Sequence, residues 1–275
     1  MVSIVYMVAG MSSRFGGKIK QFARVGPQGE TLIEVSIKQA INAGYNKIVF
    51  IVGEMTEKPF KEMFGNNYQG IPIFYAKQIF DPKLRDKPGG TCDAVVCAKE
   101  VINEDFVVCN GDDLYGENTF RSLIKFSKEN KIDCATIGYK LGNALPEQGT
   151  VNRGIFSKDE FDYLVGIKET LNISKQNLKE LNLNENNLSS QNIFFIKKET
   201  LTLLEEKLIK FKKTHNDDRK SECYLPTELS NLINENKIKI KLIPTIDKWF
   251  GVTNPEDEEV VREQLKQNNA TKETL

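Results

Sequence analysis

Histidine is almost absent from this 275-residue sequence, which holds a single copy, His215. It lies in the polar run 212–217, where a surface position is expected, so chemistry that requires a histidine base is disfavoured. Cysteine is also sparse, and its copies form no CxxC pair and have apolar neighbours. We therefore expect buried free thiols in a protein of a reducing compartment, the cytoplasm. The cysteines are Cys92, Cys97, Cys109, Cys134 and Cys223.

The sequence has no net charge and no long apolar run. Lys plus Arg total 38 and Asp plus Glu total 38, so no global field steers the protein toward nucleic acid or an anionic membrane. No apolar run approaches the roughly 18 residues needed for a membrane-spanning helix. The apolar start, residues 1–8, has no basic segment and leads into a glycine-rich stretch, which predicts a strand and not a signal peptide. We expect no nucleic acid or membrane partner, and a local site for any polyanionic ligand.

Two common nucleotide-binding motifs are missing as well. A Walker loop needs Gly-Lys followed by Ser or Thr, and here Ile19 follows Lys18. The dinucleotide motif GxGxxG does not fit either, because Gly10 is not followed by glycine two residues later. A dinucleotide-dependent oxidoreductase is therefore disfavoured.

What the first half does contain is an alternation of short apolar runs and helical patterns. Strands are expected at 2–8, 47–52, 71–75, 106–109 and 133–140, with helices at 31–43, 58–64, 93–101 and 118–129. This alternation predicts an α/β fold with a doubly wound, mostly parallel, Rossmann-like sheet. Ligands are then expected at the carboxyl ends of the strands.

The second half predicts a smaller, loop-rich lobe. Strands are expected at 151–156, 161–167 and 237–244, helices at 200–212, 227–236 and 256–265, and a mobile loop or short surface helix over 171–191. With no internal repeat or linker, we expect a single domain, residues 1–275. Its parts are a core (1–140), the smaller lobe (141–255) and a C-terminal helix with a polar tail (256–275).

The loop that follows the first strand has the composition of an anion site. It reads AGMSSRFGGKIKQ over residues 9–21. Small residues let backbone N–H groups approach phosphate oxygens, and Arg14, Lys18 and Lys20 supply positive charge.

This loop resembles the signature of the sugar nucleotidyltransferases (NDP-sugar pyrophosphorylases). The form AGMSSRFGGKIKQF followed by VGPQGETLIE is similar to a bacterial branch of that family. The resemblance continues in order through GGTCDAV, NGDDLYG, GTVNRGIF, SECYLPTEL and KWFGVTNPED, so it covers nearly the whole chain. It implies Mg²⁺-dependent transfer of a nucleoside monophosphate from an NTP to a sugar 1-phosphate, with release of pyrophosphate.

The resemblance implies a catalytic group and a nucleotide-binding group of residues. Arg14 would stabilise the leaving phosphates, Lys20 would lie near the α- or sugar phosphate, and Asp112 would hold the metal. Two acids at the carboxyl end of a buried strand need such a partner, and Mg²⁺ suits carboxylate and phosphate oxygens. Asp113 would support the metal ligand or contact the ribose. The other nucleotide contacts would be Ala9, Gly10, Met11, Gln78, Gly90 and Thr91, and Gln78 suggests a pyrimidine base.

The sugar would be bound by Gly149, Glu169 and Asn192. Two departures from the family pattern leave alternatives open. Thr170 stands where many relatives have a lysine that contacts the sugar phosphate, so this contact would come from Arg153 or Lys168, or would be weaker. The segment 251–254 has no Asp for a second metal contact. Either Thr253 or Asn254 would supply an oxygen, or the metal would rest on one protein carboxylate plus phosphate oxygens and waters.

Other functions on the same fold stay open from the sequence. One is transfer to a non-sugar phosphate such as phosphocholine, and another is a non-catalytic protein that binds nucleotide or sugar. A homo-oligomer is also open, because no exposed heptad or edge-strand pattern decides the assembly.

Overall fold

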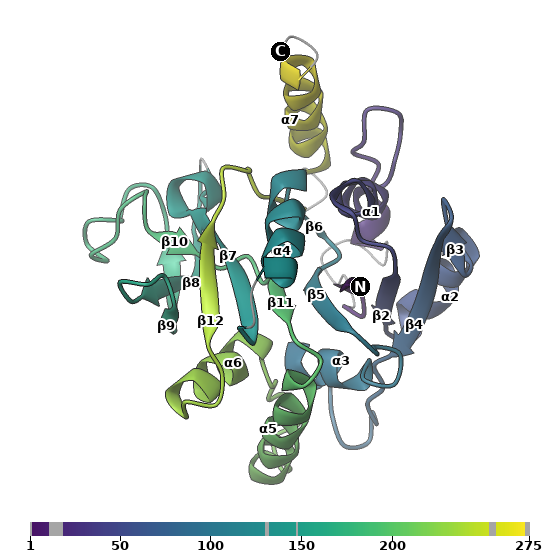
Figure 1. Cartoon of the computed structure of the whole chain (residues 1–275), viewed down its shortest axis with the longest axis vertical. Helices are drawn as coiled ribbons and strands as arrows, with labels where there is room; N and C mark the ends of the chain where they lie inside the picture. The colour runs from purple at the N-terminus through teal and green to yellow at the C-terminus, as the bar shows by residue number, and fades with distance from the viewer. Residues whose placement is uncertain (1, 11–18, 130–131, 147, 253–256, 273–275) are drawn as a thin grey trace.

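The computed structural model describes residues 2–10, 19–129, 132–146, 148–252 and 257–272. Its main feature is an 11-stranded mixed sheet with helices on both faces (Figure 1). None of the helices in these ranges has the length and apolar character to cross a bilayer.

The first half of the chain forms the parallel part of the sheet. Strands β1 (Val2–Met7), β2 (Ile48–Val52), β4 (Ile71–Lys77) and β5 (Asp105–Asn110) lie in the order β4-β2-β1-β5. All three neighbouring pairs are parallel. Because β2 lies on one side of β1 and β5 on the other, the strand order reverses between β1 and β5. A crevice for ligands is expected at the carboxyl ends of these two strands.

Both faces of the sheet are covered, as the continuous apolar runs predicted. In β1 the side chains of Ile4 and Tyr6 join one core cluster and Val5 joins the other. One face carries α1 (Leu32–Ala43), α2 (Glu54–Phe64) and α4 (Glu117–Glu129). The other carries α3 (Thr91–Cys97), α5 (Thr200–Thr214) and α6 (Leu225–Asn234). The doubly wound fold is therefore confirmed.

The second half adds antiparallel strands to the same sheet. Strand β11 (Phe194–Ile196) lies between β5 and β7 (Cys134–Lys140) and is antiparallel to both. Strand β12 (Ile240–Pro244) pairs parallel with β7. Beyond β7 come β10 (Leu188–Ser189), β8 (Val151–Lys158) and β9 (Leu164–Ile173), all antiparallel.

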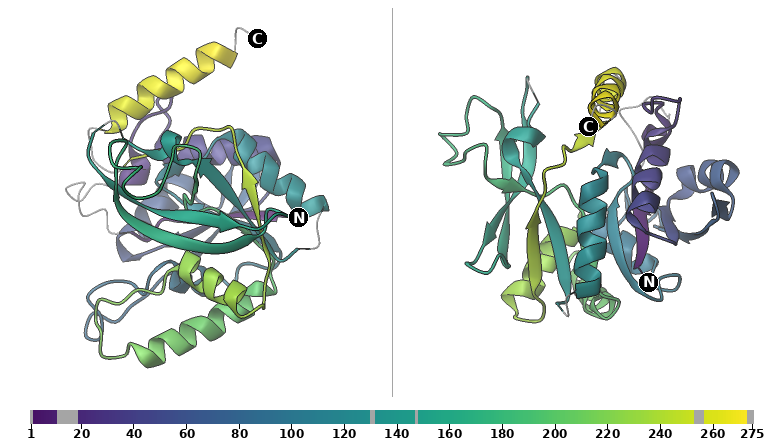
Figure 2. Two further views of the ribbon diagram at one scale, coloured as in Figure 1. Left: turned by 90° about the vertical axis from the view of Figure 1, so that its left-hand side faces the viewer. Right: turned by 45° about the horizontal axis from the view of Figure 1, so that its top comes forward.

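The remaining elements are short or peripheral. Strand β3 (Asn67–Tyr68) flanks β4, and β6 (Asp113–Leu114) pairs with β13 (Phe250–Gly251). Two 3-10 turns are η2 (Lys20–Phe22) and η3 (Leu141–Ala144). Helix α7 (Asp257–Lys272) lies at one end of the molecule, opposite the end formed by α5 and α6 (Figure 2).

Some predicted bounds differ from the structure. Strand β9 runs to Ile173, six residues beyond its predicted end. Of the loop or short helix expected over 171–191, turns and loops are what follow β9, up to β10. Helix α2 begins at Glu54, four residues before the predicted start, so Pro59 lies inside it. The earlier start is stabilised by Thr56, whose Oγ1 accepts a hydrogen bond from the Gly53 N–H at 2.9 Å.

Candidate functional site

Lys20 and Asp112, two of the residues named from the resemblance, lie together near the carboxyl ends of β1 and β5. Lys20 Nζ lies 2.7 Å from Asp112 Oδ2 and also donates to the Val252 carbonyl at 3.3 Å. Both side chains are partly exposed, at 20% and 27%. Gly111 allows the segments that follow β1 and β5 to approach each other closely, because a Cβ at Gly111 would lie 2.3 Å from Val8 Cγ1. A cation and a carboxylate from distant segments thus meet at the point where the strand order reverses.

Asp113 lies beside Asp112 but in a different environment. It is buried, and its Oδ2 accepts hydrogen bonds from Asn110 Nδ2 at 2.8 Å and from the Tyr115 hydroxyl at 3.2 Å. Burial and then repulsion from Asp112 raise the pKa of Asp113 to about 7, although these hydrogen bonds oppose the shift. A cation held by Asp112 would offset the same repulsion.

The phosphate loop and the expected second metal contact are described only in part. Ala9 and Gly10 follow β1 at the carboxyl end of the sheet. Met11, Arg14, Thr253 and Asn254 lie outside the described residues. The segment before Thr253 does reach the site, because β13 pairs with β6 so that Gly251 lies opposite Asp113.

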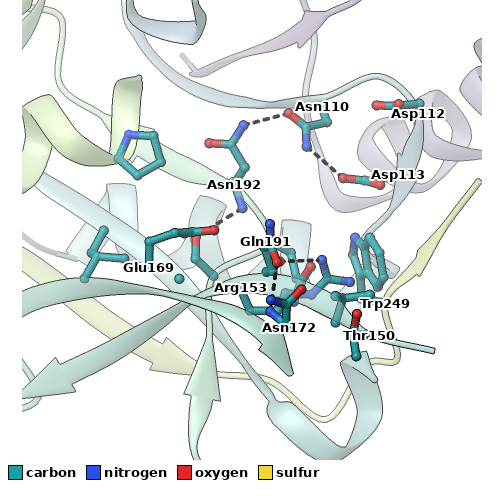
Figure 3. A pocket seen from close by; sticks show the side chains of 16 residues that line it. Asn110, Asp112, Asp113, Thr150, Arg153, Glu169, Asn172, Gln191, Asn192 and Trp249 are labelled. Carbon is teal, nitrogen blue, oxygen red and sulfur yellow. Dashed lines mark hydrogen bonds between the residues drawn. The ribbon is translucent and has the colours of Figure 1, made fainter. Parts of the chain in front are cut away.

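A pocket of about 570 Å³ opens beside the two acids and contains Glu169 and Asn192 (Figure 3). Its wall is rich in side chains that can both donate and accept hydrogen bonds, which suits a ligand with several hydroxyl groups. Five of the lining residues are amides: Asn110, Asn152, Asn172, Gln191 and Asn192.

The β8–β9 hairpin supplies the carboxylate of this pocket. Gly154 pairs with Glu169 across the two strands, and a Cβ on Gly154 would meet Ile167 Cγ2 at 2.8 Å. The absence of a side chain at Gly154 therefore keeps the space beside Glu169 open. Burial raises the pKa of Glu169, and the charge of Arg153 opposes this shift.

Asn192 closes the pocket on the β5 side. Its Nδ2 donates to Asn110 Oδ1 at 2.7 Å, and Asn110 in turn donates to Asp113 (Figure 3). Asn192 adopts a positive φ of 58°, a conformation that asparagine tolerates better than most residues. A hydrogen-bonded chain thus connects the expected sugar contact to the acids after β5.

Three buried polar atoms of the pocket residues have no hydrogen-bond partner among the described residues. They are Arg153 Nε, Asn192 Oδ1 and Trp249 Nε1. A buried donor or acceptor without a partner is costly, so such atoms mark places where a ligand or water completes the hydrogen bonding. Their presence in one cavity is a second indication that it is a binding site.

Gly149 does not line this pocket. It adopts a φ of 84° and lines an adjoining cavity of about 740 Å³ on the side of α7. Gly154 is the glycine that the structure places beside Glu169. The proposed sugar contact of Gly149 stays a prediction.

Gln78, Gly90 and Thr91 lie together at the start of α3, away from the lining of this pocket. The buried amide of Gln78 donates to the Gly90 carbonyl at 3.0 Å and to Asp93 Oδ2 at 2.8 Å. Thr91 Oγ1 accepts from the Leu225 N–H at 2.8 Å and so caps α6. These contacts explain how the segment is held, and its nucleotide-binding role stays a prediction.

The donor set after β5 fits a magnesium ion shared with a substrate. In the described ranges no group of three or more His, Cys, Asp or Glu side chains is arranged to hold a metal. Mg²⁺ commonly binds through one or two carboxylates plus phosphate oxygens and waters. Asp112, partly exposed and next to the buried Asp113, could supply the single protein carboxylate of such a site.

Comparisons with known proteins place this geometry in context. A sequence model of the nucleotidyl transferase family matches residues 18–161. Bifunctional protein GlmU of Staphylococcus carnosus (strain TM300) is 26% identical over 256 residues, which cover 90% of this chain and 49% of GlmU. The chain therefore spans about half the length of this relative.

Solved structures of similar shape are more distant in sequence. A Bacillus anthracis protein described as a candidate glucose-1-phosphate thymidylyltransferase gives a TM-score of 0.72 at 13% identity, with 96% of this chain and 95% of that chain covered. The inositol-1-phosphate CTP transferase of T. maritima gives 0.67 at 15% identity, with 97% and 96% covered. At these identities the likeness shows the fold.

Proposed function

The chain belongs to the nucleotidyl transferase family, and from that premise we propose that it transfers a nucleoside monophosphate from an NTP to a sugar 1-phosphate. The observation that carries the proposal is the Lys20–Asp112 pair at the carboxyl ends of β1 and β5, which opens into the pocket that contains Glu169 and Asn192. Asp112 and the groups that would bind hydroxyls line the same cavity, and Lys20 pairs with Asp112.

The reaction requires positioning and charge neutralisation from the protein. An oxygen of the sugar phosphate attacks the α-phosphorus in line, a new P–O bond forms, and the bond from the α-phosphorus to the bridging oxygen breaks as pyrophosphate leaves. Lys20 neutralises phosphate charge at the reacting end, and Arg14 stabilises the departing β/γ-phosphates. No nucleophilic side chain of the enzyme is needed.

Asp112 would hold the magnesium ion, and Asp113 would support the position of Asp112. When bound, the ion supplies positive charge to both phosphate groups. Asp113 contributes by fixing the end of β5, because Asn110 and Tyr115 both donate to it.

The pocket favours a polyhydroxylated acceptor over phosphocholine. Glu169 and the amide side chains can accept and donate to ring hydroxyls. A quaternary ammonium group is bound by open aromatic faces, whereas the Trp249 ring is stacked by Arg153, whose Cζ lies 4.8 Å from the ring centroid. A cyclitol phosphate is the second candidate acceptor, because a fold neighbour is named as an inositol-1-phosphate CTP transferase.

A pyrimidine nucleotide is the proposed donor. The N–H groups of the Gln78 amide are used by Gly90 and Asp93. Its carbonyl oxygen would accept from the N3–H of uracil or thymine, and Gly90 and Thr91 would lie against the base.

The test is a search for the product with the full chain and Mg²⁺. The four NTPs and dTTP are crossed with a panel of sugar 1-phosphates, inositol 1-phosphate and phosphocholine, and ³¹P NMR identifies the products. We expect one nucleotide and one sugar 1-phosphate to give an NDP-sugar and pyrophosphate. Product from phosphocholine alone, or from no acceptor at all, would contradict the proposal.

A further inference from the structure

Arg153 lies in the wall of the pocket that contains Glu169 and Asn192. Its Cζ lies over the Trp249 ring, 4.8 Å from the centroid. Its Nη1 donates to the Asn152 carbonyl at 3.1 Å and its Nη2 to the Ala144 carbonyl at 3.2 Å. These contacts fix the plane of the guanidinium and leave further N–H groups to bind a ligand.

Two donors at this position lack partners within the described part of the chain. Arg153 Nε and Trp249 Nε1 are both buried in the pocket lining. Each is a donor that cannot accept, so a ligand group that satisfies them must present acceptor oxygens. An oxyanion does this and also pairs with the positive charge.

Arg153 is the one cationic side chain among the described residues that line this pocket. Asp112, Asp113 and Glu169 line it too, so the described lining carries more negative than positive charge. A phosphorylated acceptor that enters this lining is repelled by the carboxylates and needs a local cation. Burial lowers the pKa of the Arg153 guanidinium, but arginine stays charged at neutral pH.

The strand register explains why Arg153 occupies this place. Arg153 pairs with Thr170 across β8 and β9. Thr170 is the position where, by the sequence resemblance, many relatives have a lysine that contacts the sugar phosphate. Lys168, the other cation on this hairpin considered for the task, is exposed and does not line the pocket.

We infer that Arg153, stacked on Trp249, binds the phosphate group of the acceptor, in place of the lysine that Thr170 replaces. The inference rests on the proposed function for the identity of the acceptor. It adds a phosphate-binding residue that neither the family match nor the relatives assign.

The test measures binding and needs no turnover. Full-length protein with Mg²⁺ and α,β-methylene-UTP is titrated by calorimetry with glucose 1-phosphate, N-acetylglucosamine 1-phosphate and inositol 1-phosphate, and with the matching unphosphorylated compounds. We expect the wild type to prefer at least one phosphorylated ligand by about tenfold or more, the ratio that one charge-assisted contact gives. Arg153→Gln should abolish this preference, and Arg153→Lys should restore part of it.

Lys168→Gln is the matched control and should keep the wild-type preference. Where turnover is found, Arg153→Gln should raise KM for the acceptor and leave KM for the nucleotide unchanged. The inference is overturned if no phosphorylated ligand is preferred by the wild type, if Lys168→Gln loses the preference, or if Arg153→Gln keeps it. A preference that depends on Arg153, in a protein that makes no NDP-sugar, would sustain the inference and refute the proposed reaction.

Discussion

Asp112 and Asp113 are neighbours in the sequence and have different surroundings in the structure. Asp112 is partly exposed and pairs with Lys20, whereas Asp113 is buried and receives hydrogen bonds from Asn110 and Tyr115. The sequence alone shows two adjacent acids. Their different surroundings follow from β6, which begins at Asp113 and buries that side chain.

Lys20→Met tests whether the charge of Lys20 serves catalysis or the stability of the fold. We expect kcat for pyrophosphate release to fall by about 100-fold, because a positive charge on the reacting phosphates is lost. The midpoint of thermal unfolding should change little, since a partly exposed ion pair contributes about 0–1 kcal/mol. Lys168→Met, on an exposed strand position, serves as the control for loss of a lysine. Unchanged kcat in Lys20→Met would remove Lys20 from the mechanism.

Gly251→Ala tests the contact between β13 and the acids. A Cβ at Gly251 would lie 2.5 Å from Trp249 Cζ2 and 2.8 Å from Asp113 Oδ1. We expect the free energy of unfolding, measured with denaturant, to fall by about 1–3 kcal/mol, together with reduced activity. The reason is that β13 must move away from β6 to make room for the added methyl group. Gly166→Ala is the matched control, since a Cβ there meets no atom within 4 Å. Equal stability of the two variants would show that β13 does not pack as described.

At the scale of elements, strand β11 shows where sequence patterns stop being informative. The strand itself is FFI, and with the two residues before it the segment reads NIFFI. A run this short and apolar cannot be assigned from periodicity. Its place between β5 and β7, antiparallel to both, follows from long-range pairing. The parallel strands of the first half were predictable because the segment between each strand and the next contains a helix, as parallel pairing requires.

Phe195→Ala measures how much β11 contributes to the core. Phe195 is 1% exposed, and its ring centroid lies 5.6 Å from that of Phe126 in α4. We expect a loss of about 3–5 kcal/mol in the free energy of unfolding, the usual range for a buried phenylalanine. Phe161→Ala should change stability by less than about 0.5 kcal/mol, because that ring is 64% exposed. Similar losses in both variants would contradict a central position for β11.

At the scale of the whole molecule, the site is assembled from segments far apart in the chain. Lys20, Asp112, Glu169 and Asn192 were all named from the resemblance, and the structure places them around one cavity or its rim. Trp249 was missed as a site residue although it is the single tryptophan of the chain. Its role depends on stacking with Arg153, which no local pattern reports.

Apart from Asn192, the amides of the pocket were missed for a related reason. Asn110 and Gln191 are ordinary polar residues at strand ends, and only the pairing of β5 with β11 brings their strand ends together. The resemblance could name Lys20, Asp112, Glu169 and Asn192 because they stand in motifs of the family. It gave no signal for neutral side chains outside its known contacts, whose position depends on tertiary contacts.

The predicted core, residues 1–140, can be tested as a fragment for its ability to fold without the rest of the chain. Helices α5 and α6 and strands β11 and β12, all from residues 194–244, pack in the same core as the first half. A fragment of residues 1–140 loses the cover of α3 by α5 and α6. We expect no cooperative thermal unfolding by circular dichroism from this fragment, in contrast to the full chain. A sharp transition would show that 1–140 is an independent domain.

The central claim, that Asp112 serves nucleotidyl transfer, is tested most directly by pyrophosphate release from the best substrate pair. Wild type, Asp112→Asn and the exposed control Asp217→Asn are compared with Mg²⁺ and after chelation. The account predicts turnover in the wild type and Asp217→Asn, loss of about 100-fold or more in Asp112→Asn, and loss in all three on chelation. Full activity in Asp112→Asn, or activity that survives chelation, would contradict it.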